Sequence, residues 1–350
     1  MLGLGKNKTL VGLDIGSSAV KAVELRKKGD TYELVNLGIE LLGPDTVVDG
    51  AIMDALSVAS AIEKIFTDNR IKSKNVATAV SGHSVIVKRV TVAASTDEEL
   101  YNSVPYEAQQ HIPFDMADVN LSYQPLGPAP GGNGTEVMLV AVKREKILNH
   151  TNVLSQAGKF PSVVDYDGFA VSNAFEVNYD VPADLTVALL NIGASIMNIV
   201  IARNGVPLFT RDVSVGGNQY TDTLQKELDL SFEDAEKLKQ GFELGNVTPE
   251  QKAPLLHSVT EILMLEIQKT FDFFRQTASN VNIQQIYIGG GTAKTEGLID
   301  QLKTEFNIPV EVINPFSRVL VDEKKFDLGY VHELAPRLGV AVGLALRSFD

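Results

Sequence analysis

The sequence predicts an α/β protein made of two related halves around a cleft, with a small α+β subdomain inserted into the first half. The first observation is an internal repeat, because residues 190–202 (LNIGASIMNIVIA) align without a gap on residues 13–25 (LDIGSSAVKAVEL). The second is the alternation of short apolar runs, typical of strands, with apolar residues at helical spacing. The third is a set of glycine-rich turns at predicted strand ends. The 350 residues are enough for two domains with separate cores.

The composition excludes several classes of function. The formal net charge of −13 argues against nonspecific binding to nucleic acid or to an anionic membrane. The chain has no cysteine, which excludes disulfides, thiolate metal sites and cysteine catalysis and fits a reducing compartment. No apolar stretch is long enough for a signal peptide or a membrane span. We therefore expect a soluble, cytoplasmic protein that has no nucleic-acid partner.

The first element is a strand–turn–strand segment whose turn follows Asp14 and reads Gly16-Ser17-Ser18. One interpretation is an ordinary hairpin with Asp14 as a turn former. The other is a turn whose backbone N–H and hydroxyl groups face a phosphate, with Asp14 near a metal ion. The repeat 177 residues later favours the second interpretation. It aligns Asp14 with Asn191 and Lys21 with Asn198.

Residues 77–160 resemble a small α+β module of their own. We expect a strand over 85–92, a helix that follows the N-cap signature Ser95-Thr96 and runs to about His111, and a loop over 125–134. Pro105 should kink this helix or mark its real start. A strand at 139–142 and a helix over 144–157 complete the module.

The second half continues the α/β pattern with three glycine-bearing turns. Gly216-Gly217 should precede a helix over 219–228, and a Ser231-capped helix follows. A long helix over 249–280 should break near Pro254. A strand at 286–288 ends in three glycines before a helix from about Lys294. The last element is a small-residue helix over 337–346.

These motifs, taken in order, resemble those of the actin-like ATPase superfamily. The matching segments are DIGSS with a following lysine, LNIGAS, SVGG, IYIGGGTAKTEGL and LGVAVGLAL, and no Walker-type loop is present. Within the superfamily, residues 104–126 and 163–175 are similar to the PilM family of type IV pilus assembly proteins. FtsA proteins also have an inserted module, but their chains are longer and end in a linker and a membrane-binding amphipathic helix. This sequence stops at Asp350.

The resemblance implies an actin-like fold and a division into domains. The first half would comprise residues 1–76 and 161–186, with 337–350 as a closing helix. The inserted subdomain, which would bind a partner, would span 77–160. The second half would span 187–336.

The resemblance also implies ATP and Mg²⁺ as ligands. Asp14 would hold Mg²⁺ through water, and Lys21 would neutralise phosphate charge. The first turn would surround the β-phosphate, the second would face the γ-phosphate, and the later motifs would border the ribose and adenine. The residues implied are Gly16, Ser17 and Ser18; Gly193, Ala194 and Ser195; Gly216 and Gly217; Glu236 and Lys239; and Gly290 and Gly291. From spacing alone, Glu236 and Lys239 equally fit a solvated helix face.

Two candidate catalytic residues depart from the superfamily pattern. Asn191 replaces an aspartate, and an amide can orient water but cannot carry charge or take a proton. Asp167, which aligns with the carboxylate that orients the attacking water, is one methylene shorter than a glutamate, and it could also be an ordinary turn residue. Because phosphoryl transfer depends mostly on positioning and electrostatics, we expect ATP binding with at most slow hydrolysis.

The resemblance implies a scaffold at the inner face of the inner membrane. It would dock the N-terminal cytoplasmic peptide of PilN, and it would link that peptide to the pilus motor ATPase and the platform protein. The 85–92 strand could border the peptide groove, or it could be an ordinary internal strand. The alternatives are an FtsA-like bacterial actin that self-assembles into filaments and a sugar or acid kinase of the same fold. Membrane contact would come only through partners.

Overall fold

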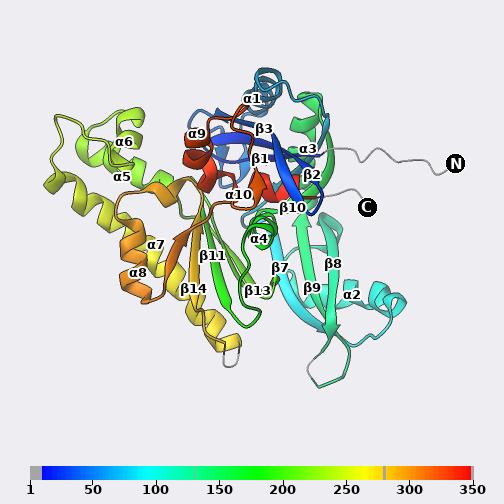
Figure 1. Cartoon of the computed structure of the whole chain (residues 1–350). Helices are drawn as coiled ribbons and strands as arrows, with labels where there is room; N and C mark the ends of the chain where they lie inside the picture. Colours follow the sequence, from blue (N-terminus) through cyan, green and yellow to red (C-terminus); the bar gives the residue numbers. More distant parts are fainter. Residues whose placement is uncertain (1–9, 130, 279–280, 348–350) are drawn as a thin grey trace.

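A computed structural model describes residues 10–129, 131–278 and 281–347 (Figure 1). Residues 1–9 and 348–350, at the ends of the expected first half, lie outside the described residues, as do 130 and 279–280. Two large sheets form the two halves, and a third, smaller sheet lies at the lower right of Figure 1. None of the helices within the described ranges is long and apolar enough to cross a lipid bilayer.

The first half contains a six-stranded sheet in the order β10-β6-β1-β2-β3-β16. Its strands are β1 (Val11–Ile15), β2 (Ala19–Lys28), β3 (Thr31–Leu41), β6 (Asn75–Val80), β10 (Phe160–Tyr166) and β16 (Val319–Leu320). A two-stranded ribbon, β4 (Val47–Val48) with β5 (Ala51–Ile52), precedes helix α1 (Ala55–Asp68). Alternate residues of β1 face opposite sides, so Val11 and Leu13 pack on α1 and α3 (Arg144–Gln156).

The second half repeats this plan with a five-stranded sheet in the order β13-β12-β11-β14-β15. Its strands are β11 (Thr186–Ile192), β12 (Met197–Arg203), β13 (Val206–Val213), β14 (Gln285–Gly289) and β15 (Val310–Val312). In both sheets the first strand of an antiparallel hairpin pairs on its other side with a parallel strand. One face is covered by α5 (Gly217–Leu228), α6 (Phe232–Lys239), α7 (Pro249–Thr277) and α8 (Leu298–Phe306).

Helices α4 (Asp167–Asn178) and α10 (Gly339–Ala345) lie at the centre, between the two sheets (Figure 1). One core cluster joins their side chains to residues of β6 and of β11. The small-residue helix expected near the end of the sequence packs closely, because a Cβ atom at Gly343 would lie 1.7 Å from the Ala170 carbonyl oxygen. A short helix, α9 (Leu328–Leu334), and a 3₁₀ turn over Ala335–Leu338 precede it.

The inserted segment has its own sheet and core. Its strands β7 (Val85–Val92), β8 (Val119–Pro128) and β9 (Thr135–Lys143) pair in the order β7-β9-β8, and α2 (Asp97–His111) covers the sheet. The 85–92 strand is therefore an edge strand, not an internal one. The expected domain boundary at residue 77 falls inside β6, which pairs with β1, and β16 returns residues 319–320 to the first sheet.

The helix expected to run to about His111 is confirmed as α2, which begins at Asp97, so Pro105 lies inside it and does not mark its start. A capping box between Thr96 and Glu99 fixes that start. Two other expectations about helices were wrong in detail. Helix α7 runs through Pro254 without a break, held by its apolar stripe on the sheet. The helix expected from about Lys294 begins at Leu298, because residues 291–294 form a 3₁₀ turn against β14.

Candidate functional site

The first turn joins β1 to β2 and carries an ion pair. Asp14 and Lys21 are direct partners in the strand register, and Lys21 Nζ lies 2.8 Å from Asp14 Oδ2. The backbone N–H of Gly16 donates to the Ala19 carbonyl at 3.1 Å and closes the turn. Asp14 is almost fully buried, whereas Ser17 is half-buried and Ser18 is exposed.

The second turn, between β11 and β12, has the same geometry with different chemistry. Asn191 faces Asn198 in the register, and its Nδ2 donates to Asn198 Oδ1 at 2.8 Å. Gly193 N–H donates to the Ile196 carbonyl at 2.9 Å, as Gly16 does to Ala19. The repeat in the sequence is therefore a repeat in structure, and an amide pair takes the place of the ion pair.

Four backbone N–H groups on these two turns have no acceptor within the described part of the chain. They belong to Ser17, Ser18, Ala194 and Ser195. Unpaired successive N–H groups on tight turns form the concave donor sets that bind anions. Each of the two turns therefore offers backbone donors suited to a phosphate group.

A polar network connects the second turn to the first half through Asp212 on β13, which sequence reasoning missed. Asp212 accepts hydrogen bonds from Asn198 Nδ2 at 2.8 Å, from the Tyr166 hydroxyl at 2.6 Å and from Gly82 N–H at 2.6 Å. Tyr166 is the last residue of β10, and Gly82 follows the end of β6. The carboxyl ends of these two strands of the first sheet therefore meet Asp212 of the second sheet. A pattern of polar residues in register on three neighbouring strands, at 191, 198 and 212, could have indicated it.

Asp167, at the first position of α4, lies in this acidic environment. Burial, followed by the charge of Asp14, raises the pKa of Asp167 to about 7. A hydrogen bond with the Ser81 side chain opposes that rise. The carboxylate is therefore only partly ionised near neutral pH, and its pKa lies in the range that suits a group exchanging protons at that pH.

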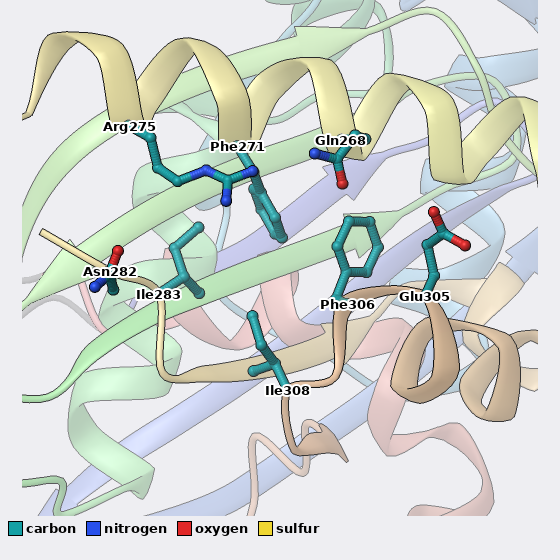
Figure 2. A pocket seen from close by; sticks show the side chains of 8 residues that line it. All are labelled: Gln268, Phe271, Arg275, Asn282, Ile283, Glu305, Phe306 and Ile308. Carbon is teal, nitrogen blue, oxygen red and sulfur yellow. The ribbon is translucent and has the colours of Figure 1, made fainter.

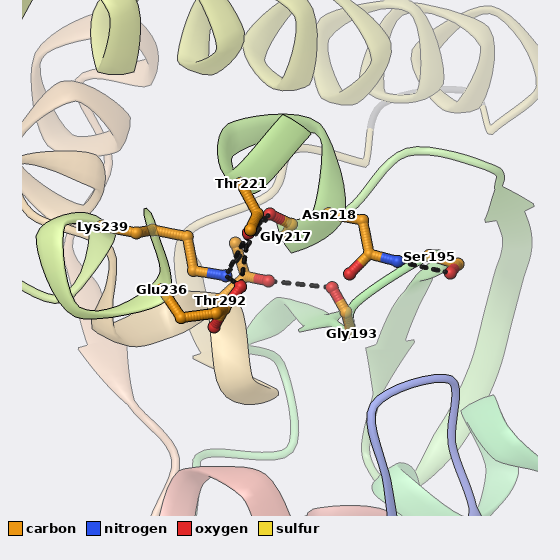
Figure 3. A network of polar contacts seen from close by, with 8 residues as sticks. All are labelled: Gly193, Ser195, Gly217, Asn218, Thr221, Glu236, Lys239 and Thr292. Atoms are coloured by element: carbon orange, nitrogen blue, oxygen red, sulfur yellow. Dashed lines mark hydrogen bonds and ion pairs between the residues drawn. The ribbon is translucent and has the colours of Figure 1, made fainter. Parts of the chain in front are cut away.

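Glu236 and Lys239 on α6 pack against the start of α5 (Figure 3). Lys239 is buried, and its Nζ donates to Glu236, to Thr221 Oγ1 at 3.1 Å and to the Gly217 carbonyl at 3.4 Å. Burial lowers the pKa of Lys239, although the charge of Glu236 opposes this. The Lys239 ammonium group is therefore hydrogen-bonded inside the protein, and Lys239 is not part of a solvated helix face.

The α5 start is also joined to the second turn. Gly217 N–H donates to the Gly193 carbonyl at 2.9 Å, and Asn218 N–H donates to the Ala194 carbonyl at 2.8 Å. Thr292 Oγ1 donates to the same Gly193 carbonyl at 2.8 Å (Figure 3). A Cβ atom at Gly216 would lie 2.6 Å from both carbonyl oxygens, so this junction has no room for a side chain.

The triple-glycine turn after β14 packs against the end of β11, next to the second turn. Gly290 has a φ of 85°, and a Cβ atom there would lie 2.1 Å from the Ile192 carbonyl oxygen, so the position requires glycine. Gly291 is exposed, and the nearest atom to a Cβ there would be Arg337 Nε at 3.9 Å. Arg337 Nε is buried without a hydrogen-bond partner in the described residues. Arg337 is thus a second residue that sequence reasoning missed, because only the fold brings it beside Gly291.

A hollow of about 330 Å³ lies elsewhere in the second half (Figure 2). Side chains of α7, of the end of α8 and of the residues before β14 and β15 line it, with Phe271 and Phe306 at its centre. It lies at the opposite end of β14 from Gly290 and Gly291. The hollow is therefore separate from the two turns.

A comparison with known families identifies the family of this chain. A family model described as type IV pilus assembly protein PilM matches residues 12–349. The chain belongs to the PilM family. It is also similar to a chain of a solved PilM–PilN type IV pilus biogenesis complex, with 28% identity, 97% of this chain and 98% of that chain covered, and a TM-score of 0.86.

Two more distant structures share the fold of this PilM-family chain. The ethanolamine utilization protein EutJ from Carboxydothermus hydrogenoformans has 16% identity, coverage of 96% of this chain and 89% of that chain, and a TM-score of 0.58. MreB5 of Spiroplasma citri bound to ADP has 14% identity, coverage of 96% and 94%, and a TM-score of 0.51. The predicted actin-like ATPase fold is therefore confirmed.

The side chains of this PilM-family chain also show what kind of metal site they could form. Within the described ranges, no group of three or more histidine or acidic side chains could hold a metal by itself. Asp14 is a single carboxylate already paired with Lys21. This donor set fits Mg²⁺ held mainly by phosphate oxygens and water, which is the usual coordination of Mg²⁺ in nucleotide sites.

Proposed function

We propose that the chain is a pilus assembly scaffold that binds ATP with Mg²⁺ and docks the N-terminal cytoplasmic peptide of PilN. The observation that carries the proposal is the pair of repeated turns in a PilM-family chain, with four N–H groups that have no acceptor among the described residues. The peptide partner is supported by the similarity to a chain solved in a PilM–PilN complex.

In this proposal each predicted site residue has a defined task. Asp14 orients the water shell of Mg²⁺, and Lys21 balances phosphate charge. The backbone donors of the two turns bind the β- and γ-phosphates. Gly216, Gly217, Glu236 and Lys239 border the ribose side, and Gly290 and Gly291 border the nucleoside, where the unpaired Arg337 Nε is a further candidate donor.

Hydrolysis should be slow for two reasons. Asn191 donates its amide to Asn198, so it is already committed and carries no charge. Asp167 is one methylene shorter than a glutamate, so its carboxylate reaches less far toward an attacking water. We therefore propose turnover well below the roughly 1–100 s⁻¹ of typical kinases.

Calorimetry on protein freed of bound nucleotide tests the ATP site. Wild type should bind Mg·ATP, and Asp14→Ala should bind it more weakly. A side chain at the exposed Gly291 should obstruct the nucleoside, so Gly291→Val should bind poorly while keeping its fold. Gly290→Val is not a suitable probe, because its Cβ would collide with the Ile192 carbonyl. An absence of wild-type binding at millimolar ATP would refute this part of the proposal.

The peptide site should involve the inserted subdomain, which we place at the segment built on the β7-β9-β8 sheet. Strand β7 has one unpaired edge among the described residues, and an extended peptide can add to such an edge through backbone hydrogen bonds. Docking to PilN in this way would bring the chain to the inner face of the inner membrane, near the motor ATPase and the platform protein.

Fluorescence anisotropy with a labelled PilN N-terminal peptide tests the docking, with a scrambled peptide as control. Saturable binding of the native peptide to ATP-loaded protein is expected. Its absence, together with nucleotide-dependent pelleting, would instead favour a filament-forming protein that self-assembles.

A further inference from the structure

Lys146 on α3 is a buried lysine without a carboxylate hydrogen-bonded to it. Only 9% of the residue is exposed, and its Nζ donates to the Gly50 carbonyl in the β4–β5 turn. An ammonium group has three donors. Within the described residues the structure gives Lys146 no second acceptor and no ion pair. Buried lysines are rare unless they are paired, so this side chain needs an explanation.

The ammonium lies beside the second turn. A Cβ atom placed on Gly50 would lie 2.8 Å from Lys146 Nζ, 3.3 Å from Ile196 Cδ1 and 3.5 Å from the Ser81 carbonyl oxygen. These three atoms therefore surround one small space. Ile196 closes the turn that carries Ala194 and Ser195.

The same space borders the candidate catalytic carboxylate. The Ser81 side chain hydrogen-bonds Asp167, and Asp167 is the first of three carboxylates, with Asp212 and Asp49, that act on Lys146 electrostatically. Their charges raise the pKa of Lys146, but burial outweighs them and lowers it. Lys146 therefore lies within electrostatic range of Asp167, near the Ile196 end of the second turn.

The two lysines near the turns differ in how they are engaged. Lys21 is neutralised by Asp14 at 2.8 Å. Among the described residues, the hydrogen-bond acceptor for Lys146 Nζ is a neutral carbonyl, and Asn191 on the second turn is an uncharged amide that donates to Asn198. Within the described part of the chain, the second turn thus has beside it a lysine that makes no ion pair, and a phosphate group is an anion that an ammonium recognises as a point charge.

We propose that Lys146 is a further binding residue for the terminal phosphate of ATP and makes this site prefer the triphosphate over the diphosphate. The proposal rests on the proposed ATP site. The competing explanation is that Lys146 only tethers the β4–β5 turn to α3.

Paired titrations with Mg·AMPPNP and Mg·ADP separate these explanations. Lys146→Met keeps the aliphatic stem and removes the charge. It should weaken AMPPNP binding roughly 10- to 100-fold, as expected for the loss of one charge-assisted hydrogen bond, and weaken ADP binding less than about threefold. Lys146→Gln, which can still donate to Gly50, should behave in the same way. Lys226→Met, at an exposed lysine of α5, is the control and should change neither affinity.

The outcomes distinguish the two proposals. Equal weakening of both nucleotides, or recovery of AMPPNP affinity in Lys146→Gln, would leave Lys146 a structural tether and overturn this inference alone. No binding of either nucleotide by wild type would overturn the ATP site and the inference together. Melting curves without nucleotide report whether the variants fold. If they do not, lysine-selective NMR on wild type decides, because the Lys146 ε signals should shift with AMPPNP more than with ADP.

Discussion

Asn191 and Asn198 differ from their counterparts Asp14 and Lys21 in charge but not in position. Each pair faces across an antiparallel hairpin, and each side-chain contact is 2.8 Å long. In the second half, however, the pair continues to Asp212, which already carries a negative charge. An ion pair at the second turn would change this whole network, so the amides are coupled to Asp212.

Asn191→Asp should raise the hydrolysis rate and lower stability. The new carboxylate restores a charge at the second turn but faces Asn198 Oδ1, so a buried acceptor loses its donor at a cost of about 1–3 kcal/mol. Phosphate release and denaturant unfolding measure the two effects. A rate equal to or lower than wild type in folded protein would contradict the role assigned to the missing charge.

Asp167→Asn should change how the stability of the nucleotide-free protein depends on pH. The pKa of Asp167 is raised from 3.8 to about 7, so between these values the folded state holds a proton that the unfolded state releases. Wild-type stability therefore falls as pH rises from about 4 to about 7. The free energy of unfolding of Asp167→Asn relative to wild type should increase over the same range and level off above pH 8, as denaturant titrations at pH 5, 6, 7 and 8 can show. A constant difference would contradict the raised pKa.

At the scale of elements, caps and close approaches fix where helices begin and how they dock. The capping boxes at Thr96 and Thr248 are visible in the sequence and set the starts of α2 and α7. The docking of α10 is different, because the need for glycine at position 343 comes from its contact with Ala170 of α4. A strand such as β7 is likewise identified by its residues, whereas its place at a sheet edge depends on which strand lies beside it.

Gly343→Ala should destabilise the protein by about 1–3 kcal/mol through overpacking. A Cβ atom at this position would lie 1.7 Å from the Ala170 carbonyl oxygen, so α10 or α4 must move. Gly245→Ala is the matched control, because a Cβ there meets no atom within 4 Å, and its effect should stay within about 0.5 kcal/mol. Equal melting temperatures for the two variants would contradict the close packing of α10.

At the scale of the whole molecule, Asp212 joins three parts of the chain. It binds β12 of its own sheet, the end of β10 and the residue that leads from β6 into the inserted subdomain. A second contact, 3.1 Å between Ser214 Oγ and His83 Nε2, lies next to it. The path from the second turn to the inserted subdomain is thus a short series of hydrogen bonds.

Asp212→Asn should loosen this connection. The amide can no longer accept from all three donors, which should cost about 1–3 kcal/mol. Hydrogen exchange of the segment around Gly82 should become faster than in wild type, while exchange in α7, which packs on the far face of its own sheet, should change little. Asp184→Asn, at an exposed residue, is the control. Unchanged exchange at Gly82 would mean that the hydrogen bond to Asp212 contributes little.

The sequence by itself determined the elements and the two turns of this protein, because strand alternation, helix caps and glycine turns depend on neighbours within a few residues. The internal repeat alone aligns Asn191 with Asp14 and Asn198 with Lys21, and so relates the second turn to the first. Only the tertiary structure decided which distant residues meet. Asp212, Arg337 and Lys146 lie on separate segments, and packing brings Asp212 to Gly82, Arg337 to Gly291 and Lys146 to Gly50. No local pattern records such contacts, since they depend on how the two sheets and the central helices bury their apolar faces together.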